Sequence, residues 1–214
     1  MWPENNSDGQ ETPPRRSFIE EARRAQIIGA AITTIAETGF DAASLAQIAA
    51  RAGISKGVIS YHFAGKDELM EQVVTQVYTS VTESTLPRVL EQESAIAMLR
   101  THILTIAAYM RDHREQLMAL REIFTKFRTP EGRPHYGITA NEGIYEALEG
   151  LYRAGQDSGE FRPFDTRVMA VSQQAGIDSM FDYWATHPDH DLDIHARELA
   201  DLFEYAVRPQ SPGP

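Results

Sequence analysis

Residues 44–66 read SLAQIAARAGISKGVISYHFAGK, and this stretch decides the fold. Ser44 is a favoured N-cap residue, and Gln47 stands three positions later, where a capping box requires Glu or Gln. Gly53 falls where a glycine can end a helix in the left-handed conformation. The pattern therefore predicts a short helix between Ser44 and Gly53.

A second short helix is predicted directly after the first. Ser55 is placed as its N-cap, and helical spacing buries Phe63 together with either Val58 or Ile59. Two short helices joined by a glycine turn form a helix-turn-helix. The small side chain of Ala49 lets the second helix cross the first closely, so we expect the outer face of the second helix to point toward solvent.

The outer face of this second helix carries hydrogen-bond donors and aromatic rings. Such side chains reach the phosphates and base edges of a DNA major groove. The composition of this face therefore predicts contact with double-stranded DNA. The residues on it are Lys56, Gly57, Ser60, Tyr61 and His62, and Lys66 lies just beyond them.

The stretch resembles the TetR family of bacterial transcription regulators. The resemblance covers roughly residues 20–75 and rests on the two short helices, an aromatic triplet and the start of the next helix. The matching positions are Phe40, Ser44, Ile48, Ala49, Ala52, Gly53, Ile54, Ser55, Tyr61, His62, Phe63, Lys66 and Leu69.

The resemblance implies an all-α protein of about nine helices, with a three-helix DNA-binding domain followed by a helical domain for effector binding and dimerisation. It implies a transcriptional regulator, here expected to be a repressor that binds a palindromic operator as a homodimer and is released by a small apolar or amphipathic molecule. The expected base contacts are Lys56, Gly57, Val58 and Ser60, and the expected phosphate contacts are Ser44, Tyr61, His62 and Lys66.

Composition and the absence of known motifs argue against several other classes of protein. The 214 residues include 42% hydrophobic and 24% charged side chains, which is typical of a soluble globular protein. The absence of cysteine excludes disulfides and thiolate sites, and no apolar run approaches the length of a membrane span, so we expect a cytoplasmic protein. No glycine-rich phosphate loop, GxSxG or HExxH motif occurs, so we expect neither an enzyme nor a bound cofactor or metal.

The charge is divided unevenly along the chain. The net charge is −11, yet residues 15–66 hold seven basic against four acidic side chains. Residues 67–214 hold 13 basic and 24 acidic side chains. A basic end on an acidic body is typical of a protein that presents one end to a polyanion.

Helical periodicity and turn residues predict the domain boundaries and the remaining helices of the chain. We expect a disordered arm over residues 1–16, the DNA-binding domain over 17–65, the effector and dimer domain over 66–207, and a disordered tail over 208–214. In the helix from Lys66 we expect Leu86 on the apolar side, and we expect Asp193 to cap the last helix. The predicted longer helices cover residues 17–38, 66–89, 94–112, 114–127, 141–155, 165–185 and 194–207.

The body is rich in aromatic and methionine residues, which suit an adaptable apolar pocket. The last two long helices join through a short connection and are expected to pair with their own copies in a four-helix interface. The candidate effector-lining residues are Met98, Tyr109, Met110, Met118, Phe124, Tyr145, Tyr152, Met180, Phe181 and Trp184.

Two alternatives compete with DNA binding. The segment His187–His195 holds three histidines and three aspartates, residue types that bind zinc, so a helical metal protein or enzyme is one alternative. A protein-interaction module that keeps the helix-turn-helix only as a scaffold is the other.

Overall fold

The computed structural model describes residues 18–209, apart from the side chains of residues 138 and 139. The predicted arm 1–16 and residues 210–214 of the predicted tail lie outside the described residues. Residues 18–209 form nine α-helices and one 3₁₀ helix, with no β-structure beyond a single isolated bridge, which confirms the all-helical prediction. No helix in this range is long and apolar enough to cross a bilayer. The elements are α1 (Phe18–Thr38), α2 (Leu45–Arg51), α3 (Lys56–His62), α4 (Lys66–Leu90), α5 (Ala95–Asp112), α6 (Arg114–Lys126), η1 (Ile138–Asn141), α7 (Glu142–Asp157), α8 (Thr166–Thr186) and α9 (Leu192–Val207).

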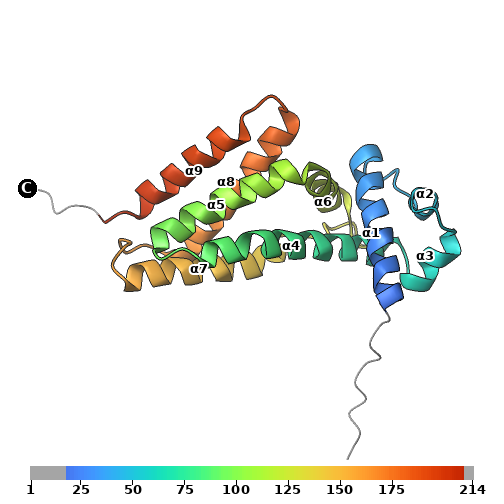
Figure 1. The fold of residues 1–214 in the computed structure, drawn as a ribbon, viewed down its shortest axis with the longest axis horizontal. Coiled ribbons are helices and arrows are strands. Elements are labelled where there is room, and N and C mark those ends of the chain that lie inside the picture. Colours follow the sequence, from blue (N-terminus) through green and yellow to red (C-terminus); the bar gives the residue numbers. More distant parts are fainter. Residues whose placement is uncertain (1–17, 210–214) are drawn as a thin grey trace, which may run out of the picture.

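The helices divide into a small head and a larger body. Figure 1 shows α1, α2 and α3 at one end of the molecule, and α4 running from that end along the body. In the body, α9 packs along α5, and α7 packs along α8. Because α6 packs against α1, both α4 and α6 join the head to the body.

Local sequence signals determine the helix-turn-helix. The Ser44 hydroxyl accepts a hydrogen bond from the Gln47 amide at 3.3 Å, and the Gln47 side chain accepts one from the Ser44 amide at 3.0 Å, so the predicted capping box is confirmed. Gly53 has a φ of 66°, in the left-handed region that favours glycine. These two features start α2 and turn the chain into α3.

Two predicted details are wrong. Asp191, not Asp193, caps α9, because its carboxylate accepts from the Ile194 amide at 2.8 Å, while Asp193 lies in the first turn and pairs with Arg111. Leu86 was predicted on the apolar side of α4, but it is 46% exposed. The residues of α4 that face the core in this part of the helix are four positions apart: Val77, Val81, Thr85 and Val89. Leu86 therefore lies one position off that stripe.

One hydrophobic cluster joins the head to α4 and α6. Ile27, Ile48 and Ile59 from the three head helices are fully buried together with Leu69 from α4 and Ile123 from α6. The predicted division of the chain at residue 65 therefore separates segments that share one core. A second cluster fills the body and includes Leu99, Ile103, Ile177 and Met180.

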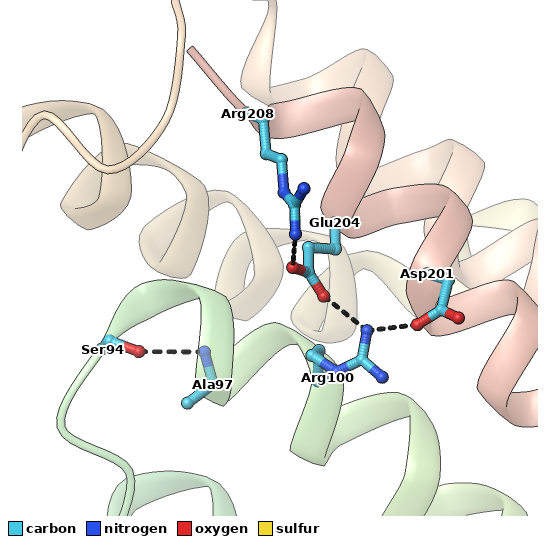
Figure 2. A network of polar contacts seen from close by, with 6 residues as sticks. All are labelled: Ser94, Ala97, Arg100, Asp201, Glu204 and Arg208. Atoms are coloured by element: carbon cyan, nitrogen blue, oxygen red, sulfur yellow. Dashed lines mark hydrogen bonds and ion pairs between the residues drawn. The ribbon is translucent and has the colours of Figure 1, made fainter.

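Ion pairs fasten α9 to α5. Figure 2 shows Arg100 of α5 between Asp201 and Glu204 of α9, while Arg208 reaches Glu204 from the end of α9. Hydrogen bonding to Asp201 is the main cause that raises the pKa of Arg100. Arg100 and Glu204 are half-buried and Asp201 is exposed. Ion pairs near the protein surface contribute about 0–1 kcal/mol each, so the buried side chains supply most of the stability of this contact.

The packing of α7 gives a matched test of the body. A Cβ atom at Gly155 would lie 2.2 Å from Cδ2 of the buried Phe161 ring, whereas a Cβ atom at Gly150 would meet no atom within 4 Å. Gly155→Ala should therefore lower the free energy of unfolding by about 1–3 kcal/mol through overpacking. Gly150→Ala should raise it by about 0.5–1 kcal/mol, because alanine is the better helix former. Urea denaturation measures both, and equal effects would contradict this packing.

Candidate nucleic-acid interface

The outer face of α3 is exposed, as the sequence predicts. Ile59 and Phe63 are buried against the head core, so the opposite side of the helix faces solvent. Tyr61 is 75% exposed, which is unusual for a large aromatic side chain in a short helix. Of the eight predicted contact residues, α3 brings six onto one short segment, and only Val58 and His62 among them are half-buried. These six are Lys56, Gly57, Val58, Ser60, Tyr61 and His62.

Neighbouring contacts hold these side chains in place. The rings of Tyr61 and His62 meet edge to face, with their centroids 5.0 Å apart. The Ser60 hydroxyl donates to the Lys56 carbonyl at 3.3 Å. Ser44 is exposed at the start of α2, where its hydroxyl is engaged in the capping box. A phosphate contact from Ser44 stays a prediction.

Lys66 has a structural partner that the sequence did not reveal. Its ammonium donates to the Phe40 carbonyl at 2.7 Å and lies 4.3 Å from the centre of the Phe40 ring. Burial lowers the pKa of the Lys66 ammonium, and the carboxylates of Asp41 and Asp67 partly offset this effect. Lys66 thus ties the start of α4 to the turn between α1 and α2. An ammonium has three donors, so a phosphate contact from Lys66 also stays a prediction.

Two side chains of α1 hold the ends of both short helices. The Gln26 amide donates to the Ala52 carbonyl at 2.8 Å, at the end of α2. The Arg24 guanidinium donates to the His62 carbonyl at the end of α3 and stacks on the Phe63 ring at 4.1 Å. Arg24 is 8% exposed. These contacts fix the direction in which α3 presents its outer face.

Arg24 also approaches α4. Its guanidinium lies 3.7 Å from the Glu68 carboxylate, which itself accepts a hydrogen bond from the Ala64 amide at 2.6 Å. One buried cation therefore contacts the end of α3 and the first turn of α4. Sequence reasoning missed this role, although Arg24 stands three and four residues before Ile27 and Ile28, on the buried face of α1.

The predicted effector-lining residues lie mainly in the body core. Phe124 lines a cavity of about 360 Å³, together with Val74, Thr75, Tyr78 and Thr79 of α4, Tyr136 and Ala140. The other nine contribute to the packed body: Tyr109, Met110, Tyr145, Tyr152, Met180, Phe181 and Trp184 are buried, and Met98 and Met118 are half-buried.

A chain of polar side chains crosses this core, from the buried Tyr152 and Gln173 to His102. The Tyr152 hydroxyl donates to the Gln173 carbonyl oxygen, and the Gln173 amide nitrogen lies 3.0 Å from Nδ1 of His102. Burial lowers the pKa of His102 to about 4, so its imidazole is neutral at pH 7 and Nδ1 accepts from Gln173. The His102 side chain itself is half-buried.

The segment His187–His195 forms local pairs. Nε2 of His190 lies 2.9 Å from Nδ1 of His195, while the His187 ring stacks on Tyr183 at 4.2 Å. Over residues 18–209, no three His, Cys, Asp or Glu side chains are arranged to hold a metal ion.

A helix-turn-helix with an exposed second helix, carried on a helical body, defines a class of DNA-binding proteins. Residues 27–73 match the family described as Bacterial regulatory proteins, tetR family. The regulator BetI of Paraburkholderia xenovorans (strain LB400) is 29% identical over 188 residues, which cover 75% of this chain and 94% of BetI. Residues 27–73 therefore carry the DNA-binding domain of the tetR family, and the comparisons support a TetR-family DNA-binding transcriptional regulator.

Solved structures with this fold include a putative TetR-family regulator from Rhodococcus sp., with a TM-score of 0.74, 19% identity and coverage of 87% of this chain and 99% of that chain. FadR from Bacillus subtilis, solved in complex with stearoyl-CoA, has a TM-score of 0.76 and 22% identity and covers 86% and 99% of the two chains. At these identities the similarity defines the fold.

The Arg24 contacts predict a position-specific loss of stability. Arg24→Met keeps the apolar stem but leaves the His62 carbonyl and Glu68 without their cation, so the free energy of unfolding should fall by about 1.5–3 kcal/mol. The amide of Phe63 should exchange its hydrogen faster. Arg23→Met, the same change at a residue whose hydrogen bond to Gln26 is exposed, should alter stability by less than about 0.5 kcal/mol. Equal losses in the two variants would contradict a specific role for Arg24.

Proposed function

We propose that the protein is a repressor that binds a pseudo-palindromic operator as a homodimer and leaves it when a small molecule binds the body. The observation that carries the proposal is the exposed face of α3, held outward by α1. In this proposal Lys56, Gly57, Val58 and Ser60 contact base edges. Ser44, Tyr61, His62 and Lys66 contact phosphates.

An exposed apolar face on α8 and α9 supports the dimer. Val168 and Tyr183 of α8 are 63% and 49% exposed, and Leu202 and Tyr205 of α9 are 62% and 79% exposed. Exposed apolar patches of this kind mark association sites, and a two-fold axis pairs the same patch on both copies. Small exposed residues lie between the larger ones on α8 and permit close helix approach: Ser172, Ala175 and Ser179.

The operator geometry follows from the two-fold symmetry. Two copies of α3 would enter successive major grooves, so the half-sites would lie about 34–36 Å apart or somewhat more. The excess of basic residues in the head favours approach to phosphates, while the acidic body is repelled from them.

Release requires that DNA and effector favour different arrangements of the two heads. The helix α4 extends from the head into the body, and α6 packs on α1. A shift of either helix in the body would therefore move the head. The FadR structure of the same fold holds stearoyl-CoA, which supports a ligand site in a body of this kind. We propose the ten predicted lining residues for that site. Nine of them are packed in the body, so their side chains would have to move apart before a small molecule could enter.

The DNA contacts predict a loss of affinity without unfolding. Lys56→Ala and Tyr61→Ala should each weaken binding to a selected operator about tenfold or more, which corresponds to about 1.4 kcal/mol, because each removes one contact. Arg88→Ala removes an exposed cation from the distal end of α4 and should leave affinity unchanged. Gel-shift titration measures affinity and circular dichroism checks the fold. Unchanged affinity in both head variants would overturn the contact assignment.

The dimer face predicts a change in association. Leu202→Glu places a charge in the proposed interface and should shift the protein from dimer to monomer in sedimentation analysis at micromolar concentration. Leu90→Glu is the matched control, because Leu90 on α4 is 65% exposed and Leu202 is 62% exposed. A Leu202→Glu protein that stays dimeric, or a Leu90→Glu protein that becomes monomeric, would contradict pairing through α8 and α9.

A further inference from the structure

The connection between α8 and α9 brings two histidines together, which we name the histidine pair. His190 lies in the connection, and His195 lies near the start of α9. Nε2 of His190 is 2.9 Å from Nδ1 of His195, and the two ring planes meet at 87°. Both side chains are half-buried, so the two nitrogens face each other where solvent still reaches the rings.

Local contacts hold the histidine pair in this arrangement. The His190 amide donates to the His187 carbonyl at 2.9 Å, and the His195 amide donates to the Asp191 carbonyl at 3.1 Å. The Asp191 carboxylate also caps the first turn of α9. From the end of α8, the Tyr183 ring meets the His190 ring edge to face, with the centroids 4.8 Å apart. The two nitrogens are therefore close together before any ligand binds.

The distance between the two nitrogens suits a metal ion as well as a shared proton. One neutral imidazole can donate to the other, but the same two lone pairs can bind one cation once that proton leaves. Metal–nitrogen bonds are about 2.0–2.1 Å long, so two nitrogens at a right angle about the metal lie about 2.8–3.0 Å apart. A tetrahedral angle would place them about 3.3–3.4 Å apart. The observed 2.9 Å matches the right angle, which is typical of square-planar and tetragonal Cu²⁺ and Ni²⁺ sites.

The charges of this segment also favour a cation. Residues 187–195 hold three aspartates and neither lysine nor arginine. The nearby Arg111 of α5 is paired with Asp193. Burial lowers the pKa of His195, and the neighbouring His190 adds to this effect. His195 is therefore neutral at pH 7, which is the form in which imidazole binds a metal.

From the spacing and orientation of these nitrogens, we infer that the histidine pair binds one Ni²⁺ or Cu²⁺ ion in two adjacent coordination positions, with water in the others. A site with two protein ligands agrees with the absence of a three-residue cluster among residues 18–209. The inference goes beyond the proposed function, because it requires neither DNA nor a second copy of the chain.

A bound ion would fasten the connection to α9. His190 would be joined to His195 through the metal while it keeps its contact with Tyr183 of α8. Because the folded chain holds the two nitrogens together, the ion should bind the folded state more tightly than the unfolded state and stabilise it.

Titration with nickel chloride tests the site. The full chain, without a histidine tag and after removal of metals with EDTA, should bind one Ni²⁺ ion per chain in calorimetry at neutral pH. The same ion should raise the midpoint of thermal unfolding. Magnesium chloride should do neither, because Mg²⁺ prefers oxygen ligands. Absence of Ni²⁺ binding at one ion per chain would overturn the inference.

Histidine variants locate the ion. His190→Gln and His195→Gln should each weaken Ni²⁺ binding at least about tenfold, or about 1.4 kcal/mol, because each leaves a single imidazole. His187→Gln is the matched control in the same segment, since the His187 ring stacks on Tyr183 away from the pair, and it should retain affinity within about twofold. Circular dichroism of the metal-free proteins checks the fold. An equal loss in His187→Gln, or binding that survives in both pair variants, would place the ion elsewhere and overturn the assignment.

Copper counts the ligands directly. The electron paramagnetic resonance spectrum of the Cu²⁺-loaded protein should show splitting from two imidazole nitrogens. In His190→Gln and His195→Gln that two-nitrogen signal should be lost. A Cu²⁺ spectrum without nitrogen splitting, or one that is the same in the wild-type protein and both variants, would contradict binding by the histidine pair.

Discussion

The contact of Arg24 with the last carbonyl of α3 is the interaction on which the proposed DNA-binding face depends. A helix of seven residues is not stable by itself in water, so α3 needs tertiary contacts to persist. Its buried side supplies Ile59, and α1 supplies Arg24 and Gln26 at the ends of the two short helices. The exposed residues of α3 are therefore free to serve recognition because other residues maintain the helix.

Polar contacts of Arg24, Lys66 and Phe40 also link the head to the body. Glu68 of α4 contacts Arg24, Lys66 holds the turn before α2, and the Phe40 amide donates to the Glu122 carboxylate of α6 at 3.1 Å. The head core also includes Ile123 of α6. A movement of α4 or α6 would thus displace α3, because in the part of the chain that the structure describes only residues 63–65 separate α3 from α4.

The sequence predicted the features that depend on neighbours along the chain. The capping pair Ser44 and Gln47 and the glycine turn at Gly53 are local, so α2 and α3 were found with accurate boundaries. Arg24 and Lys66 were not assigned their roles, because their partners lie 38 and 26 residues away and periodicity carries no information about them. The cavity that Phe124 lines was also missed, apart from Phe124 itself, because residues from α4, α6 and the segment before α7 form it together.

Hydrogen exchange of the full chain, measured with and without a DNA fragment selected from a random pool, tests the central claim most directly. If α3 lies in a DNA groove, peptides covering residues 44–63 will gain protection on DNA binding, and the distal ends of α5 and α9 will exchange as in the free protein. Protection that leaves residues 56–62 unchanged, or that falls mainly on the body, would contradict the account.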